Sequence, residues 1–357
     1  MLFFLIILIG THISFVFYPI FVIFNTLFFP ILISGILYYI TFPFVNWMQN
    51  RRIPRSFAII ILYGLLVGLL ALLFILLGPV LQREITKLLE EAPKIIEDVQ
   101  GLLLAVEQLD ILPRIWEQEA INLENLASWL SYLVRSSFSL IVENITLVAE
   151  RLTNFLIIML LIPFILFYML KEGHKLPGII TRYIPEKHKK NILHTLSDMN
   201  EAISSYIQGI FIVCIFVGIL VYIGFLIIGL DYPLVLALFA MITNVIPFLG
   251  PFIGTIPGVI VGALDSPAMM FKVIVVVIVV QQIESLVISP QVMGRKLSIS
   301  PLTIILLIMV AGRMGGLLGM ILAVPSYKIL KIVVTHIYLL VQSNKKTANQ
   351  PASLDSD

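Results

Sequence analysis

The polar side chains best suited to chemistry in this chain lie inside long apolar runs. Gln281, Gln282 and Glu284 fall within the apolar run 273–290. Gln281 and Glu284 are three residues apart, so on a helix they share a face. A carboxyl at membrane depth costs roughly 2.5–3.5 kcal/mol to insert and is a functional candidate by default. Glu284 is therefore a candidate to bind a substrate, carry a proton or pair with Arg313. A structural pair, or a position near a helix end, is the competing interpretation.

A second concentration of unusual residues is the run from Asn244 to Gly258. Pro247, Pro251 and Pro257 lie close together within it. A proline removes a backbone donor and clashes with the preceding turn, so a regular helix is not expected here. In lipid, broken backbone persists only where protein or a water-filled cavity satisfies it. Such breaks often form substrate or ion sites from freed backbone groups, and Asn244 adds a side-chain amide.

Glycines recur at four-residue intervals, as Gly250, Gly254, Gly258 and Gly262, then as Gly312 with Gly316 and Gly315 with Gly319. On a helix this spacing places the glycines on one face, where another backbone can approach closely. The usual meaning of such a face is helix packing. It becomes functional where the close contact is a gate or a moving interface.

Other polar residues carry less specific signals. Arg313 lies among glycines in an apolar run and raises the same question as Glu284. Tyr206 and Gln208 open another apolar run, where they either snorkel to the interface or line a path. Asp231, which precedes a proline, is interpreted as a turn residue outside the membrane core.

The sequence lacks the motifs of common enzymes. It contains no HExxH, Walker A or GxGD pattern. Its one cysteine, Cys214, excludes an internal disulfide and a thiolate metal cluster, and His174, His188 and His194 lack ligand spacing. We therefore predict that the protein is not an enzyme and has no metal site and no cofactor. Without a nucleotide site, an ATP-driven pump in a single chain is not expected.

The composition places these residues in a membrane. Of 357 residues, 59% are hydrophobic and 12% are charged, against about 25% charged in soluble domains. The net charge is +2, and no basic cluster has interleaved aromatics, so a nucleic-acid partner is not expected. Residues 1–50 contain no Asp, Glu, Lys or Arg. They lack the basic region of a secretory signal and exceed one span of about 20 residues.

Apolar, charge-poor runs predict an all-α polytopic membrane protein of about eight spans. The expected elements are 2–17, 22–47, 57–80, 152–170, 205–229, 233–264, 273–290 and 302–341. A break near Tyr18-Pro19 is expected between the first two. The element 233–264 is a broken Pro/Gly-rich one that either spans or re-enters, and 302–341 is one span or two elements meeting at Pro325.

The polar segments divide the chain into four parts: spans one to three (1–80), an extracytoplasmic amphipathic helical segment (81–150), spans four to eight (151–341) and a disordered tail (342–357). From Leu81 to Leu109, apolar residues recur mostly at steps of three or four, which predicts an amphipathic helix. Pro113 ends this helix, and a second one, with Trp116 and Trp129, completes a hairpin. This hairpin either packs on the membrane domain or is a lid or partner surface.

Basic residues predict the orientation of the chain in the membrane. Arg51, Arg52 and Arg55 crowd one short loop, and six Lys or Arg residues lie in 171–201. The positive-inside rule places both segments in the cytoplasm. Both termini are then expected to be cytoplasmic, and segment 81–150 is expected outside.

In order and spacing, these motifs resemble the autoinducer-2 exporter family, also called PerM-type permeases, over most of the chain. The resemblance is carried by Tyr38-Tyr39 through Pro43, Arg51-Arg52-Ile53-Pro54-Arg55, Tyr206-Ile-Gln208-Gly209, Gly229-Leu-Asp-Tyr-Pro233, Asn244, Ile246-Pro-Phe-Leu-Gly-Pro251, Gly254-Thr-Ile-Pro257, Glu284, Ser289-Pro290, Met293-Gly294, Ser300-Pro301, Gly312-Arg313, Gly316 and Gly319-Met-Ile-Leu-Ala-Val-Pro325. The N-terminus departs from the family pattern, because it begins inside the first span.

The resemblance implies a multi-pass protein of the bacterial inner membrane that moves small molecules and forms homo-oligomers of unknown stoichiometry. We predict a permease or exporter of a small polar solute, such as an autoinducer-2-like signalling molecule, with the lipid bilayer and that solute or a cation as its partners. The alternatives are a sodium(lithium)–proton antiporter and a non-transporting scaffold or regulator. The predicted pathway residues are Asn244, Pro247, Gly250, Pro251, Gly254, Pro257, Gln208, Gln281, Gln282, Glu284 and Arg313.

Overall fold

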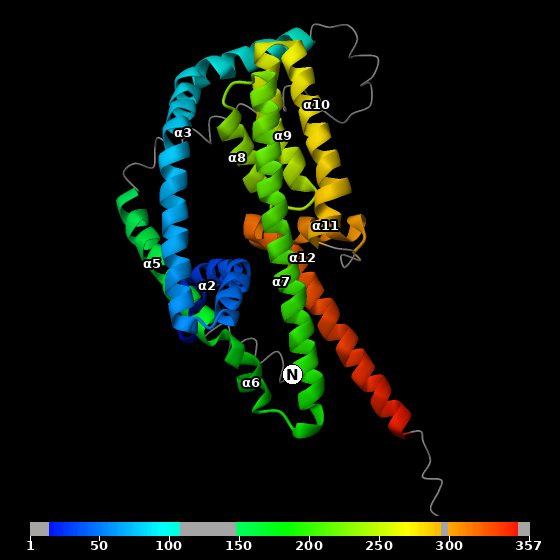
Figure 1. Ribbon diagram of the computed structural model, residues 1–357. Coiled ribbons are helices and arrows are strands. Elements are labelled where there is room, and N and C mark those ends of the chain that lie inside the picture. The colour runs from blue at the N-terminus through cyan, green and yellow to red at the C-terminus, as the bar shows by residue number, and fades with distance from the viewer. Residues whose placement is uncertain (1–13, 108–147, 294–298, 349–357) are drawn as a thin grey trace, which may run out of the picture. The chain divides into compact units, whose positions relative to one another are not determined.

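The computed structural model describes residues 14–107, 148–293 and 299–348 (Figure 1). All secondary structure in these ranges is helical, which confirms the predicted all-α class. The chain divides into two compact units. The first comprises residues 1–67 and 141–182, and the second comprises residues 68–140 and 183–357.

The first unit is built on the packing of helix α2 (Ser14–Asn50) against helix α5 (Val148–Glu172). The start of α3 (Arg55–Glu107) joins them in one apolar core, and the short helices η2 (Gly173–Lys175) and α6 (Leu176–Thr181) complete the unit. The polar bonds here reach main-chain carbonyls, as when Arg55 Nε donates to the carbonyl oxygen of Leu170 at 2.6 Å.

Helix α2 overturns the predicted break near Tyr18-Pro19. It runs unbroken from Ser14 to Asn50, although Pro19, Pro30 and Pro43 lie inside it. Each proline removes only one donor, and in an apolar segment the helix is the conformation that satisfies the remaining backbone groups internally. Most of the predicted span 2–17 lies outside the described residues.

Helix α3 contains the predicted span 57–80 and continues through the amphipathic segment without a break as far as Glu107. The expected helical character of 81–107 is thus confirmed. Pro113, Trp116 and Trp129, and with them the predicted second half of the hairpin, lie outside the described residues.

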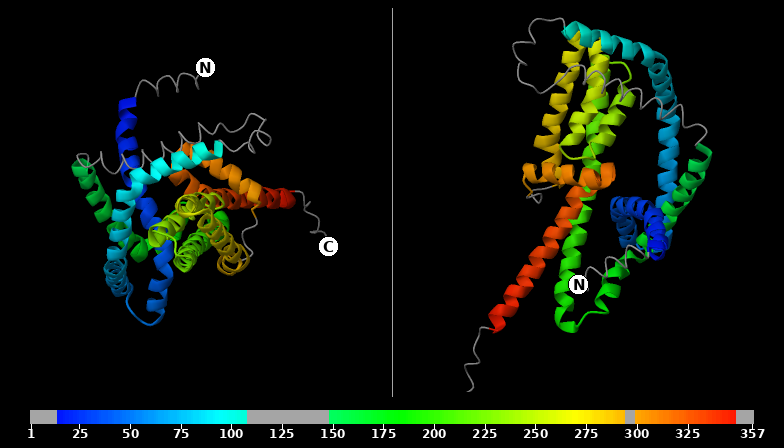
Figure 2. Two further views of the ribbon diagram at one scale, coloured as in Figure 1. Left: turned by 90° about the horizontal axis from the view of Figure 1, so that it is seen from above. Right: turned by 180° about the vertical axis from the view of Figure 1, so that it is seen from behind.

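The second unit contains a bundle of helices α7 (Glu186–Ile228), α8 (Pro233–Thr243), α9 (Leu249–Asp265) and α10 (Pro267–Ile283), which lie side by side in both views (Figures 1 and 2). Its core takes residues at four-residue steps from α7, namely Val213, Val217, Val221 and Phe225. Helix α7 begins well before the predicted start at 205, so the end of the basic segment 171–201 is helical.

The broken element 233–264 is confirmed as two helices, α8 and α9, separated at residues 244–248. The break is narrower than predicted, because α9 runs regularly through Pro251 and Pro257. Pro251 lies in the first turn, where the backbone N–H has no helical partner to lose. Pro257 costs the helix a single bond.

The glycine ridge of α9 is a packing face, as its spacing predicts. Gly250, Gly254, Gly258 and Gly262 are all buried. A Cβ atom on Gly254 would lie 2.9 Å from the Cα of Ala240 in α8. One on Gly262 would lie 3.2 Å from the Cα of Met270 in α10. The ridge therefore lets α9 lie against both neighbours at close range.

The C-terminal region is broken at a different place from the one predicted. Helix α12 (Pro301–Ala348) contains a non-helical kink at Gly315 and Gly316, whereas Pro325 lies inside the helix. Gly316 has φ 57° and ψ −142°, a conformation essentially restricted to glycine. A Cβ atom on Gly319 would collide with the carbonyl oxygen of Ala311, so the two halves meet across the kink.

Two further expectations for α12 need correction. Because the kink interrupts the helix, the pairs Gly312/Gly316 and Gly315/Gly319 do not form helical ridges. The helix also continues to Ala348, so residues 342–348 are helical where a disordered tail is expected; residues 349–357 lie outside the described ranges.

A polar network fastens the second half of α12 to α7. His336 Nε2 is hydrogen-bonded to Asp198 Oδ2 at 2.9 Å, and His336 Nδ1 is hydrogen-bonded to Thr195 Oγ1 at 3.0 Å. His194 is mostly exposed, and its ring lies 5.6 Å from that of His336.

Within the described ranges, five helical segments are long and apolar enough to cross a membrane: Thr26–Asn50, Arg55–Leu88, Lys189–Ile228, Pro267–Val292 and Pro301–His336. Helices α8 and α9 are apolar but shorter, and α5 covers the predicted span 152–170. The multi-pass character is thus supported, whereas the count of eight spans is not confirmed.

Candidate functional site

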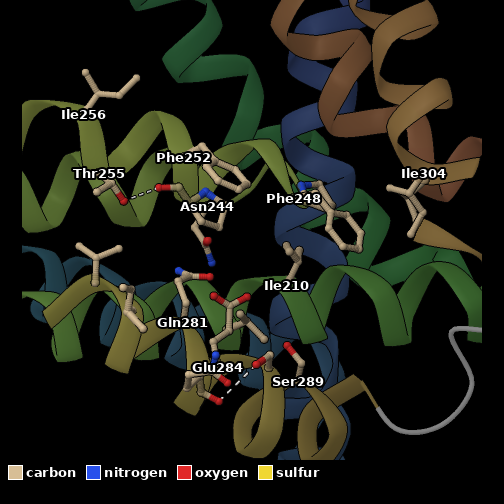
Figure 3. A pocket seen from close by; sticks show the side chains of 18 of the residues that line it. Ile210, Asn244, Phe248, Phe252, Thr255, Ile256, Gln281, Glu284, Ser289 and Ile304 are labelled. Atoms are coloured by element: carbon tan, nitrogen blue, oxygen red, sulfur yellow. Dashed lines mark hydrogen bonds between the residues drawn. The ribbon is translucent and has the colours of Figure 1, made fainter. Parts of the chain in front are cut away.

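A cavity of about 980 Å³ lies within the second unit. Its walls come from α7, the break between α8 and α9, α9 itself, α10 and α12 (Figure 3). Two short elements that follow α10 complete it, the π-helical turn η3 (Glu284–Ile288) and α11 (Ser289–Met293). The two irregular stretches predicted from the sequence, the proline-rich break and the region of Glu284, therefore meet at one cavity.

Several backbone groups of the break bond within the break, and a side chain faces the cavity. The N–H of Ile246 donates to the carbonyl of Thr243 at 3.0 Å, and that of Gly250 donates to the carbonyl of Ile246 at 2.8 Å. Phe248 turns the chain with a positive φ of 65°. The sequence predicts that freed backbone groups become ligands, but here the Asn244 side chain is the available polar group.

Asn244 is buried at the end of α8 with an unsatisfied donor. Its side chain is 3% exposed. Its Nδ2 atom has no hydrogen-bond partner in the part of the chain that the structure describes. A buried polar atom without a partner costs about 1–3 kcal/mol, so Asn244 is suited to donate to something that enters the cavity.

Glu284 reaches the cavity at the first residue of the π-helical turn. The amide of Ser289 closes this turn on the carbonyl of Glu284, five residues back, and π turns of this kind frequently mark functional sites. The wider turn keeps Glu284 and Ser289 on the same side, so both line the cavity. The Oε2 atom of Glu284 is buried, with no hydrogen-bond partner among the described residues.

Asn244, Gln281 and Glu284 form a polar cluster on the cavity wall. Figure 3 shows their side chains pointing toward one another from three different elements. The predicted shared face of Gln281 and Glu284 is thus present despite the π turn. Together the cluster offers amide donors and acceptors and one carboxylate, which is a set that can hold a polar group of a solute.

Tyr206 adds a third unsatisfied polar atom. Its side chain is 4% exposed and lines the cavity, and its hydroxyl has no partner among the described residues. Lys328 of α12 lies against it, with Nζ 5.5 Å from the ring centroid. Tyr206 is therefore a wall residue of the cavity rather than the interfacial residue that a position at a span end suggests.

The eleven predicted pathway residues separate into two groups. Those that line the cavity are Asn244, Pro247, Pro251, Gln281, Gln282 and Glu284. Gly250, Gly254 and Pro257 belong to α9 without lining it. The Gln208 amide donates to Ser204 Oγ on its own helix at 2.9 Å.

Arg313 does not pair with Glu284, contrary to one predicted option. It is exposed, just before the glycine kink of α12, and does not line the cavity. The kink changes the direction of α12 two residues after Arg313. The predicted pairing assumed a helix without this kink.

Several lining residues were not predicted, among them Phe248, Phe252, Thr255, Ser285 and Ser289. The aromatic ones are indistinguishable from lipid-facing residues in a chain that is apolar throughout. Ser289 lies five residues after Glu284, a spacing that regular helical periodicity assigns to another face. The π turn places Ser289 on the same side as Glu284, so that it lines the cavity.

The comparisons with known proteins agree with the motif pattern. A family model described as AI-2E family transporter matches residues 2–339. The chain belongs to the AI-2E transporter family. It is 38% identical over 343 residues to the candidate transport protein YueF of Bacillus subtilis (strain 168), covering 96% of this chain and 93% of that relative.

More distant members of the AI-2E family match over similar lengths. The chain is 30% identical to the candidate transport protein YrrI of Bacillus subtilis (strain 168), covering 89% of this chain and 88% of YrrI. It is 24% identical to the candidate permease PerM of Escherichia coli (strain K12), covering 87% of each. The predicted family is thereby confirmed, and with it a multi-pass protein of a transporter family whose surroundings are a lipid bilayer.

Proposed function

We propose that the chain is a permease of the bacterial inner membrane that moves a small polar solute, with an autoinducer-2-like molecule as the first to test. The observation that carries this is a pair of buried atoms, Asn244 Nδ2 and Glu284 Oε2, at a cavity of about 980 Å³. Neither atom has a hydrogen-bond partner within the described ranges. Leaving such atoms unsatisfied is costly, so a cavity that exposes them to an incoming solute recovers that cost.

In this proposal the polar cluster replaces part of the hydration shell that the solute loses in the membrane. Asn244 and Gln281 donate and accept through their amides, and Glu284 accepts. The solute crosses either by alternating access around the cluster or through a gated pore. The α9 glycine ridge supplies the close helix contacts at which such a gate would move.

The proposal retains the orientation that basic residues favour. The loop with Arg51 and Arg52 and the segment 171–201 are cytoplasmic, and both termini lie on that side. Homo-oligomers are also proposed, because the resemblance implies them and the exposed apolar helices provide surfaces for lipid or for further copies. No nucleic-acid partner is proposed.

The test is solute efflux from loaded proteoliposomes. Glu284→Gln and Asn244→Ala are each expected to reduce efflux by about tenfold or more, the equivalent of one hydrogen bond to a charged or buried group. Asp265→Asn is the matched control, because it neutralises an exposed carboxyl at the end of α9. Unchanged efflux in both cavity variants at equal expression would contradict the assignment of the site.

Two further measurements separate the alternatives. Comparison of metabolites in vesicles with and without the protein identifies the solute without assuming autoinducer-2. A pH-sensitive dye in everted vesicles reports antiport, and a proton flux that appears on adding sodium or lithium would replace the permease by a cation–proton antiporter. Absence of every flux would favour the scaffold.

A further inference from the structure

The cavity wall has much apolar surface beside the polar cluster, so the solute can carry an apolar part as well as a polar one. Of the 23 lining residues that belong to the described ranges, 15 are Ile, Val, Phe or Pro. Its volume lies at the upper end of the roughly 300–1,000 Å³ found for ligand sites. A wholly polar molecule bound at the cluster would leave most of this wall facing water or empty space, which opposes burial of that molecule.

Apolar lining residues lie on both sides of the polar cluster, with Ile256 on one side and Phe248 and Ile304 on the other (Figure 3). Along α10 the lining passes from Gln281 back to Val277 and Ile274, a separation of about 10 Å along a helix axis. Along α9, Phe252, Ile256 and Ile260 line it at four-residue steps. Figure 3 places Ile256 beyond the point where Asn244, Gln281 and Glu284 converge. The polar cluster is therefore continuous with a long apolar stretch of wall that follows α9 and α10.

The polar cluster contains one acidic side chain. Among the lining residues that the structure describes, Glu284 is the one acidic residue, and none is Lys, Arg or His. Among the residues that the structure describes, no cation forms an ion pair with Glu284. Lys328 stays at the Tyr206 ring without lining the cavity, and Arg313 is exposed outside it. A carboxylate in this position is best satisfied by a cationic group with N–H donors.

We propose that this cavity binds an amphipathic organic amine. The protonated amine donates to the Glu284 carboxylate and to the side-chain oxygens of Gln281 and Asn244. An aliphatic or aromatic body of about 10 Å occupies the apolar stretch of the cavity that α9 and α10 both line, which is called the slot below. This inference rests on the proposed function and deepens it, because it names the class of solute that the same cavity takes.

The test compares four ligands by calorimetry on the full chain in dodecyl maltoside, which contains no amine. The ligands are 4-phenylbutylamine, 4-phenylbutanol, 4-phenylbutyrate and methylamine, and binding to protein-free micelles is subtracted. The amine is expected to bind about tenfold tighter than the alcohol, since a charge-assisted bond replaces a neutral one. Phenylbutyrate is expected to bind more weakly still, because Glu284 repels its carboxylate. Methylamine is also expected to bind more weakly, because it has no apolar group to fill the slot.

Variants test the polar cluster and the apolar slot separately. Glu284→Gln is expected to remove the preference for the amine over the alcohol, while Asp265→Asn leaves that preference unchanged. Ile256→Trp is expected to weaken the amine and the alcohol alike, because it fills the slot. Each variant is compared with the unmodified chain by melting temperature and by elution volume, and the slot variant keeps the proposal testable if Glu284→Gln does not fold.

Several outcomes would overturn the inference. Equal binding of amine and alcohol to the unmodified chain, or an undiminished preference in folded Glu284→Gln, excludes the cationic head. Equal binding of methylamine and phenylbutylamine excludes the apolar body. Displacement of the amine by phosphatidylethanolamine, but not by soluble amines, would assign the site to a lipid headgroup instead of a transported solute. If efflux of another solute depends on Glu284 while phenylbutylamine does not bind, the permease stands and this inference alone fails.

Discussion

At the residue scale, a remote carboxylate stabilises the helix that presents Asn244. Helix α8 begins after Tyr232, whose side chain does not cap it. The Glu84 carboxylate of α3 instead accepts from the backbone N–H of Leu234 at 3.3 Å and of Val235 at 2.9 Å. A carboxylate at a helix N-terminus satisfies free donors and favours the helix dipole. Glu84 is thus a cap supplied from another helix.

Two further residues of α3, Lys87 and Glu91, also contact the residues just before α8. Lys87 Nζ lies 3.0 Å from Asp231 Oδ1, which makes the predicted turn residue Asp231 one end of an exposed ion pair. The Tyr232 hydroxyl donates to the Glu91 carboxylate. Burial of Tyr232, 4% exposed, together with this carboxylate raises the pKa of the phenol, so the hydroxyl remains a donor at neutral pH.

Glu84→Ala is expected to lower the free energy of unfolding by about 1–2 kcal/mol, the usual cost of losing an N-terminal cap. Glu90→Ala, which changes an exposed residue of the same helix, is the control and is expected to have little effect. Thermal unfolding of both variants in detergent measures the difference. Equal stability of the two would show that Glu84 does not cap α8. Lys87→Ala is expected to cost less, because its ion pairs are exposed.

Residue-scale features were only partly predictable from the sequence. Glu284, Gln281 and Asn244 were selected because polar groups are rare in this chain and expensive in lipid. Glu84 was not selected, because it is one of several acidic residues in 81–107 and its partner is 150 residues away. Nothing local distinguishes an acidic residue that caps a distant helix from one that faces solvent.

At the element scale, the α9 glycine ridge sets how closely α8, α9 and α10 pack around the cavity. Gly254→Ala is expected to lower the free energy of unfolding by about 1–3 kcal/mol, because the new methyl group is forced against the α8 backbone. Gly68→Ala in α3 is the matched control. It has open space around it and is expected to gain about 0.5–1 kcal/mol from reduced chain entropy. Comparable effects of the two, measured by thermal unfolding, would contradict the packing role.

Helix breaks were only partly predictable from the positions of proline and glycine in the sequence. Proline density located the 244–248 break, but three prolines in α2 and Pro325 in α12 did not break their helices. The real kink of α12 lies at Gly315 and Gly316. Glycine permits a break without requiring one, so its role depends on tertiary contacts such as Gly319 against Ala311. The π turn after α10 likewise has no sequence signature.

At the scale of the whole molecule, composition and lipid physics were sufficient for the membrane assignment, and motif order was sufficient for the family. The span count was less predictable. Helices α8 and α9 are apolar like the spanning ones but shorter than them. Whether these helices cross the membrane depends on how they pack, and hydropathy carries no information about packing.

In the proposed function, the solute passes through the cavity of the second unit. The most direct measurement is flux through single-cysteine proteins made in a Cys214→Ser background and treated with a bulky maleimide. Ser285→Cys places the thiol in the cavity wall, and Asp265→Cys places it on the exposed end of α9. We predict that modification abolishes flux in the Ser285→Cys protein and leaves it intact in the Asp265→Cys protein. Full flux through a Ser285→Cys protein whose thiol is completely modified would contradict the account.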